Sequence, residues 1–269
     1  MTLPCLGLDG TTLTVPECPV LMLRPRAWNM TEHNVLVSGK VCPAPLVDFG
    51  LLMWHNSHAL HSQGAGPFFY LSKLEGGAEA RLWREIFLWS EAELGLPRGT
   101  IKACVLIENV LATFEMEDIL WELREHSAGL NCGVWDYSAS FVSTFGSRPE
   151  FVLPDRSKYV NMNQVHRDHS LIPQMQAMHL IITAQLFLSS YRRLLVSTAR
   201  ARGAPATGGM AANMVTGPEV EEAVISDKRR EIEAGVDGFL IYDLALAAPC
   251  RRLWAEMKGK TRGQQKVVK

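Results

Sequence analysis

Two acidic residues near the middle of the chain have the type and setting expected of a site for a hard divalent cation. Glu108 directly follows an apolar, strand-like run, and Asp136 lies just past the glycine-bearing segment 129–133. Carboxylates at the ends of neighbouring strands can hold such a cation, and backbone amides of a glycine-rich turn can hold an anion. The pattern therefore predicts a combined cation and anion site.

Apolar runs and helical periodicity alternate along the chain on both sides of this pair. Short apolar segments predict strands at residues 66–73, 101–107, 129–135, 204–210 and 238–242. Apolar residues at helical spacing predict helices at residues 78–94, 114–124, 186–202 and 219–234. This alternation is typical of a parallel sheet whose strands are joined by crossover helices.

Residues suited to chemistry recur at the ends of the predicted strands, at Arg24, Lys73, Glu108, Asp136 and Gly208. This placement favours an α/β fold of the (β/α)8 TIM-barrel type, in which the loops after the strands build the site. A doubly wound sheet would show the same alternation. It ranks second because the chain lacks a Gly-x-Gly-x-x-Gly turn after the first strand.

The composition is that of a globular chain without a strong charge bias. A length of 269 residues with 47% hydrophobic residues predicts a sizeable core, in one domain with tails. A net charge of −1 provides no general attraction to nucleic acid or membrane, so we expect neither as a partner. The six cysteines include no Cys-x-x-Cys pair, which favours free thiols, and Cys132 is expected to be a small buried hydrophobe.

One long segment is similar to a known family. Residues 126–137 read His-Ser-Ala-Gly-Leu-Asn-Cys-Gly-Val-Trp-Asp-Tyr, which closely resembles the malate synthase pattern His-x-x-Gly-Leu-Asn-x-Gly-x-Trp-Asp-Tyr. The similarity to the malate synthase barrel extends from Arg24 to about Ala212. Further matching segments lie at residues 23–28, 48–51, 66–73, 96–102, 106–108, 152–156 and 208–212. The order of these motifs makes a chance match improbable.

The resemblance implies an activity and its catalytic groups. Malate synthases condense acetyl-CoA with glyoxylate to give malate and CoA, use Mg²⁺ and act in the glyoxylate cycle. The reaction needs a cation to polarise the aldehyde, a positive group to stabilise the enolate, and a base. Glu108 and Asp136 match the Mg²⁺ ligands, and Arg24 matches the catalytic arginine. Nearby Arg26 is expected to be structural.

The same resemblance implies how the substrate is held. Gly133, Val134 and Trp135 match the turn whose amides receive the glyoxylate carboxylate. Arg24 and Asp136 complete the predicted substrate-binding set. Val134 stands where the family usually has an arginine, and Leu244 stands where it has a proline that lines the coenzyme site.

Other departures from the family predict an incomplete barrel. The family base is an aspartate of a C-terminal helical domain, and no position of this chain matches it before Lys269. The family's acidic strand before the arginine segment also has no counterpart. An open barrel has unpaired strand edges, so we expect self-association or pairing with a full-length chain.

The predicted organisation has three parts. Residues 1–19 form an irregular N-terminal arm, residues 20–250 a partial TIM barrel, and residues 251–269 a basic tail. Residues 165–186 are an apparent insertion in the barrel. The expected location is the peroxisome or glyoxysome, or the cytoplasm. No secretory signal is visible, and no C-terminal Ser-Lys-Leu peroxisomal address is seen.

Three functions fit these patterns. The first is an active malate synthase acyltransferase with glyoxylate and acetyl-CoA as substrates. The second is an inactive, truncated member of the family that binds ligands or regulates a partner. The third is a lyase of the related barrels that cleave CoA esters, which the sequence Trp135-Asp136-Tyr137 disfavours.

Overall fold

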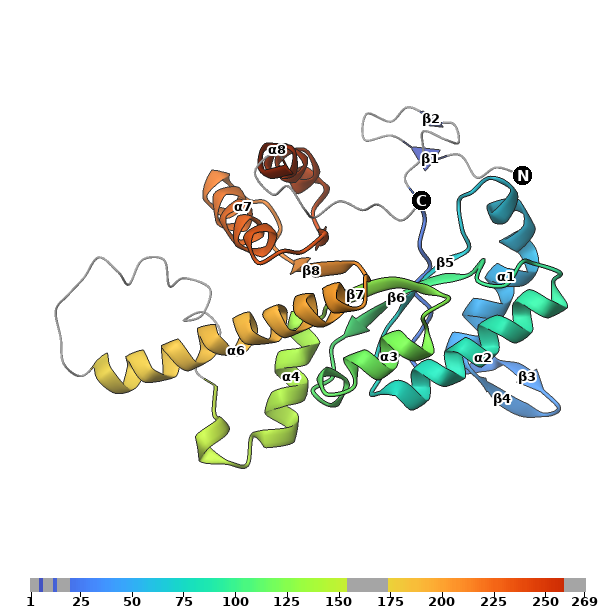
Figure 1. The fold of residues 1–269 in the computed structure, drawn as a ribbon, viewed down its shortest axis with the longest axis horizontal. Coiled ribbons are helices and arrows are strands. Elements are labelled where there is room, and N and C mark those ends of the chain that lie inside the picture. Colours follow the sequence, from blue (N-terminus) through green and yellow to red (C-terminus); the bar gives the residue numbers. More distant parts are fainter. Residues whose placement is uncertain (1–4, 7–11, 14–19, 154–173, 259–269) are drawn as a thin grey trace.

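In the computed structural model of the chain, the fold is built on an open, five-stranded parallel sheet (Figure 1). The structure describes the backbone of residues 5–6, 12–13, 20–153 and 174–258, and the side chains of residues 20–153 and 187–257. The strands lie in chain order: β5 (Phe68–Leu71), β6 (Lys102–Ile107), β7 (Ser127–Cys132), β8 (Ala206–Ala211) and β9 (Gly238–Ile241).

Helices connect the successive strands: α2 (Gly77–Glu93) after β5, α3 (Met116–Glu122) after β6, α4 (Val134–Phe145) and α6 (Gln174–Ala201) after β7, and α7 (Pro218–Glu233) after β8. Helix α8 (Ala247–Lys258) follows the last strand, β9. Short 3-10 turns lie at Leu111–Thr113, Pro149–Phe151 and Leu244–Leu246. In Figure 1, α2 and α3 lie side by side near one end of the sheet, and α7 and α8 near the other. Because the strand order never reverses, the sheet lacks the switch point of a doubly wound fold.

The first edge of the sheet carries the segment that precedes Arg24. Leu23 forms an isolated parallel bridge with Phe69, in which its N–H donates to the Phe68 carbonyl at 3.0 Å. The Leu23 carbonyl in turn accepts from the Tyr70 N–H at 2.8 Å. This pairing places Arg24 beside the carboxyl end of β5, although the segment is too short to count as a strand.

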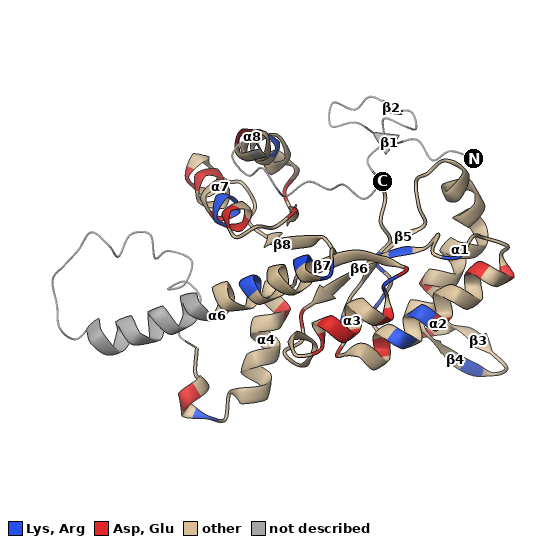
Figure 2. Cartoon of the chain, viewed as in Figure 1, with Lys and Arg blue, Asp and Glu red and all other residues tan. Residues whose placement is uncertain are grey.

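The main core lies between the sheet and its helices. Alternate residues of β6 (Ala103, Val105 and Ile107) pack in one cluster with Phe87 of α2 and Ile119 of α3. This period of two is what a strand buried on its helix-facing side requires. Charged residues of both signs occupy the exposed faces of α2 and α7 (Figure 2).

Two elements before the sheet have no counterpart in the sequence-based expectations. A hairpin is formed by β3 (Thr31–Val37) and β4 (Lys40–Pro43), and α1 (Ala44–Ser62) follows it directly. Apolar residues occur on all sides of α1, with Trp54 74% exposed, so its sequence lacks a clear helical stripe. The two-residue strands β1 (Cys5–Leu6) and β2 (Thr12–Leu13) pair with each other.

Two predicted boundaries need correction. The predicted strand 129–135 is wrong at its end, because β7 stops at Cys132 and α4 begins at Val134. The predicted helix start at residue 186 is also wrong, since α6 already begins at Gln174. Residues 174–186 of the apparent insertion 165–186 are thus part of this helix, and residues 165–173 lie outside the described residues.

The predicted tail also begins too early. Helix α8 crosses residue 250, and its Leu253 and Met257 are buried against Ile232 of α7 in a small second core. Residues 251–258 are therefore part of the folded domain, and residues 259–269 lie outside the described residues. Most of the predicted arm 1–19 lies outside them as well. Within the described chain, none of the helices has the length and apolar character needed to cross a membrane.

Candidate metal and substrate site

The two predicted metal ligands meet at the carboxyl ends of β6 and β7. Glu108 is the residue after β6, and Ile107 is paired in register with Cys132, the last residue of β7. Asp136 comes from the first turn of α4 rather than from the strand end itself. Parallel pairing therefore brings together two carboxylates that are far apart in the sequence.

Lys73 joins the two carboxylates. Its backbone N–H donates to Glu108 Oε1 at 2.7 Å, and its Nζ lies 3.4 Å from Glu108 Oε2 and 2.9 Å from Asp136 Oδ2. Lys73 adopts a left-handed backbone conformation with φ of +62°, which is uncommon for a residue other than glycine. This conformation turns both the amide and the ammonium of Lys73 toward the same carboxylate.

Burial sets different acidities for the two carboxyl groups. The Glu108 side chain is only 1% exposed, and this burial, together with a hydrogen bond to Asp136, raises its pKa to about 7. The Lys73 contacts oppose that increase. The half-exposed Asp136 has a lowered pKa, chiefly because of its hydrogen bond with Glu108 and then because of Lys73. The pair can thus share one proton, which Glu108 carries.

Gly133 allows the two ligand-bearing elements to approach. A Cβ atom on this residue would lie 2.4 Å from Glu108 Cβ and 3.1 Å from Glu108 Cα. Real Cβ atoms essentially never come as close as the shorter distance. The glycine before α4 is therefore required by the position of Glu108.

The Gly133 amide is already engaged inside the protein. It donates to the Ile107 carbonyl at 3.2 Å and to the Tyr191 hydroxyl at 3.0 Å. Its hydrogen is thus directed at two oxygens between β6 and α6, and the role of this amide in receiving a carboxylate stays a prediction. Val134 and Trp135 are the first two residues of α4, and the N-terminal end of a helix attracts anions. Their substrate-binding role stays a prediction.

Arg24 lies at the same end of the sheet. Its guanidinium is centred 5.8 Å from the Tyr70 ring and helps to lower the pKa of Asp136. Arg26, in contrast, forms ion pairs of 2.8 Å with both Asp48 and Glu32. The structure thus gives Arg26 the structural contacts expected of it and leaves Arg24 exposed beside the acidic pair.

The residues present suit Mg²⁺. This ion prefers oxygen ligands and is commonly held by one or two carboxylates, with water or substrate oxygens at its other positions. Glu108 and Asp136 supply such a pair. In the part of the chain that the structure describes, no group of three or more His, Cys, Asp or Glu residues forms a fuller protein cage.

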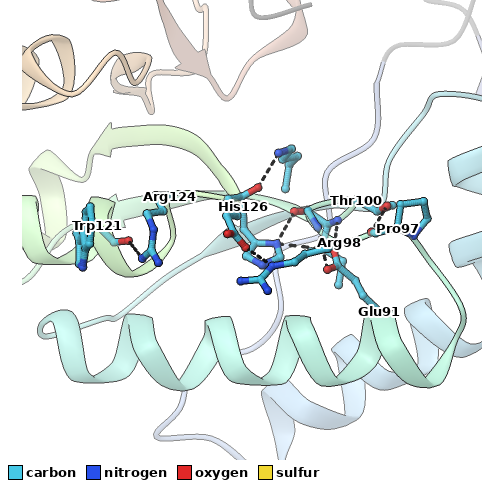
Figure 3. Close-up of polar contacts among 11 residues, drawn as sticks. Glu91, Pro97, Arg98, Thr100, Trp121, Arg124 and His126 are labelled. Atoms are coloured by element: carbon cyan, nitrogen blue, oxygen red, sulfur yellow. Dashed lines mark hydrogen bonds and ion pairs between the residues drawn. The ribbon is translucent and has the colours of Figure 1, made fainter.

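The opposite end of β6 carries a buried polar cluster that fixes the strands (Figure 3). Glu91 of α2 accepts from the Gly99 N–H at 2.9 Å and from the Ile101 N–H at 2.8 Å. His126 Nδ1 lies 3.0 Å from the Ile101 carbonyl and 3.8 Å from Glu91. Because this end is remote from the acidic pair, the cluster is expected to support stability rather than chemistry.

The buried His126 predicts a loss of stability in weak acid. Burial lowers its pKa below the ordinary 6.5, because protonation would place a hydrogen on Nε2, which has no partner among the described residues. Below pH 6.5 the unfolded chain therefore binds a proton that the folded chain does not, and unfolding becomes easier as the pH falls toward the lowered value. Thermal midpoints measured from pH 8 to pH 5.5 should fall less in His126→Gln than in the unmodified chain.

The exposed His58 provides the control for this measurement. His58→Gln should keep the full dependence on pH, because this side chain lies at the surface and the substitution leaves the buried His126 in place. An identical pH dependence in His126→Gln and in the unmodified chain would contradict the assignment.

Fold and site together define a class of protein. Parallel strands in chain order, joined by helices and carrying an acidic pair at their carboxyl ends, are the features of a TIM-barrel enzyme domain. The family model described as "Malate synthase, TIM barrel domain" matches residues 20–172 and 159–268. The chain belongs to the malate synthase TIM-barrel family, and its five-stranded open sheet is an incomplete barrel, as the sequence predicted.

Curated relatives agree with this assignment. Malate synthase of Myxococcus xanthus (strain DK1622) is 42% identical over 251 residues, which cover 91% of this chain and 42% of the relative. Glyoxysomal malate synthase of Candida tropicalis is 40% identical over 248 residues, which cover 90% of this chain and 41% of the relative. The chain therefore spans about two fifths of the length of these relatives.

A solved structure supports the fold alone. RipC from Yersinia pestis aligns with a TM-score of 0.50 and 16% sequence identity, over 88% of this chain and 79% of that protein. At this identity the similarity concerns only the architecture.

Proposed function

We propose that this chain carries the metal and glyoxylate site of a malate synthase, the acyltransferase that condenses acetyl-CoA with glyoxylate to give malate and CoA. The observation that supports the proposal most directly is the convergence of Glu108 and Asp136 beside the first turn of α4. The 40–42% identity to malate synthases over most of this chain supports it independently.

Each residue of the site has a role in this reaction. Glu108 and Asp136 would hold Mg²⁺, which when bound polarises the aldehyde of glyoxylate. We assign the binding of the glyoxylate carboxylate to Val134 and Trp135, because they lie at the positive end of α4. The positively charged Arg24 would stabilise the enolate oxygen of the acetyl group.

The bond changes follow from these roles. Loss of a methyl proton from acetyl-CoA leaves an enolate, whose carbon forms a bond with the aldehyde carbon of glyoxylate. Hydrolysis of the thioester then releases malate and CoA. We assign the Mg²⁺ and glyoxylate contacts to this chain and leave the base that takes the methyl proton unassigned.

The direct test is CoA release from acetyl-CoA and glyoxylate in the presence of Mg²⁺. Removal of Glu108 as Glu108→Ala should lower the rate on the order of 100-fold or more, since even outer contacts of a metal site contribute 10–100-fold. Glu93→Ala, at an exposed position of α2, should leave the rate unchanged. CoA release that Glu108→Ala leaves unchanged would overturn the site. A folded chain that releases no CoA would support the rival function, an inactive member of the family.

We also propose where the chain acts. Relatives from Candida tropicalis and Gossypium hirsutum carry the word glyoxysomal in their names. We favour the peroxisome or glyoxysome on this basis and keep the cytoplasm as the alternative. Fluorescence microscopy of the tagged chain beside a peroxisomal marker tests the preference.

A further inference from the structure

A buried tyrosine lies directly behind the acidic pair. Tyr191 of α6 is 3% exposed, and its hydroxyl donates to the carbonyl of Ile107 and accepts from the N–H of Gly133. Ile107 immediately precedes Glu108, and Gly133 precedes Asp136 by three residues. One hydroxyl thus links the backbones on which both carboxylates depend.

The Tyr191 ring is held independently of its hydroxyl. It stacks on Tyr137 with ring centroids 4.0 Å apart and planes 9° apart, and Tyr137 stacks in turn on Phe187 at 5.1 Å. Tyr137 is the residue after Asp136, in the first two turns of α4. The stack therefore fixes the position of the hydroxyl and packs α6 against the start of α4.

The Tyr191 hydroxyl is buried within the protein and shielded from solvent. Burial raises the pKa of Tyr191, so the phenol stays protonated and can donate to the Ile107 carbonyl. Gly133 also donates directly to that carbonyl at 3.2 Å. Removal of the hydroxyl alone therefore leaves one link between β6 and α4 and is compatible with folding.

We propose that the Tyr191 hydroxyl is a positioning group that sets the spacing of Glu108 and Asp136 and, through it, the affinity of the pair for a divalent cation. This inference rests on the proposed function, because it treats the pair as the metal site. Among the described residues, the hydroxyl of Tyr191 forms its hydrogen bonds with the backbone of Ile107 and Gly133 rather than with either carboxylate, and it would not touch the metal or the substrate. Its effect operates through the carbonyl before one ligand and the amide before the other.

The test is calorimetric titration of the 269-residue chain with Mn²⁺ as the probe ion. Tyr191→Phe keeps the ring and removes the oxygen, and should weaken Mn²⁺ binding about 10-fold or more, as expected for outer contacts of a metal site. Tyr137→Phe removes a hydroxyl from the neighbouring ring of the same stack and should bind Mn²⁺ as the unmodified chain does. Equal affinities of Tyr191→Phe and the unmodified chain would overturn the inference.

A further variant separates positioning from general stability. Phe187→Leu weakens packing on Tyr137 but keeps the stacking of Tyr137 on Tyr191 and the Tyr191 hydroxyl, so it should lower the thermal midpoint and leave the Mn²⁺ affinity unchanged. An equal loss of affinity in Phe187→Leu and Tyr191→Phe would show that packing alone controls the site and would overturn the role of the hydroxyl. Glu108→Ala distinguishes the two proposals: if Mn²⁺ binding does not depend on Glu108, the metal site itself fails.

Discussion

Replacement of Gly133 by alanine is expected to weaken divalent-cation binding at Glu108 and Asp136 strongly and to destabilise the fold. The new Cβ would lie 2.4 Å from Glu108 Cβ, 3.1 Å from Glu108 Cα and 3.2 Å from Leu106 Cγ. Neither Glu108 atom can rotate away, because both are fixed to the backbone at the end of β6. The start of α4 must therefore move away from the strand, and Asp136 must move with it.

The size of the effect follows from the closeness of this contact. Overpacking of this kind typically costs about 1–3 kcal/mol in the free energy of unfolding. Displacement of a whole ligand-bearing turn should lower cation affinity on the order of 100-fold or more, since even outer contacts contribute up to about 100-fold. Calorimetric titration with Mn²⁺ measures the affinity, and chemical denaturation measures the stability.

Gly50→Ala is the matched control for this substitution. Gly50 lies within α1, and a Cβ there would meet no atom within 4 Å. Alanine is favoured over glycine in a helix by about 0.5–1 kcal/mol, so this variant should be equally or more stable and should bind Mn²⁺ normally. Wild-type affinity in Gly133→Ala would show that α4 and β6 tolerate separation, contrary to the geometry described.

The second large effect concerns a buried charge cluster between α6, α7 and β8. Lys228 is 1% exposed, and its Nζ donates to the Gly209 carbonyl at 2.7 Å and to Glu231 Oε2 at 3.1 Å. Burial raises the pKa of Glu231, and Lys228 is the principal group that opposes this increase. Among the described residues, the Glu231 carboxylate has one further ion pair, a longer contact of 3.6 Å with Arg192.

Lys228→Met is therefore expected to destabilise the chain by about 3–5 kcal/mol, the range typical when one partner of a buried ion pair is removed. Most of this loss comes from the carboxylate of Glu231, which stays buried without its closest counter-charge. The substitution also removes the donor to Gly209. The free energy of unfolding in urea is the appropriate measurement.

A double variant tests the cause of this loss. Lys228→Met combined with Glu231→Leu removes both charges and should recover a large part of the stability, because no isolated buried carboxylate remains. If the double variant is as unstable as the sum of the single variants, the explanation is wrong. The cluster also adjoins the site. Lys228 donates to the Gly209 carbonyl, and Gly209 lies so close to the start of α4 that a Cβ on it would be 3.0 Å from the Val134 side chain.

Much of the sheet and its helices could be predicted because their signals are local. The predicted helix 78–94 differs by one residue at each end from α2, where apolar spacing and the stop at Pro97-Arg98-Gly99 act within the segment itself. The predicted strand 101–107 likewise agrees with β6. The predicted end of β7 lies three residues too late, because Val134 and Trp135 are apolar like the strand residues before them but belong to α4.

The missed elements depend on contacts that sequence periodicity does not record. Helix α1 has apolar residues all round, and the hairpin β3–β4 is almost entirely exposed, so neither shows a repeating apolar face. The predicted tail has a basic composition, yet Leu253 and Met257 are buried because α7 presents an apolar surface at that position. Composition could not reveal that partner.

By itself the sequence determined the family, the alternation of strands and helices, and the identity of Glu108 and Asp136 as a pair, because these depend on residue type and order. The tertiary structure alone decided how the pair is held. Lys73 lies 35 residues from Glu108, and Tyr191 lies 84 residues from Ile107, yet each contacts the same strand end. Contacts over such separations are formed when parallel strands and covering helices pack, and no local spacing in the chain encodes them.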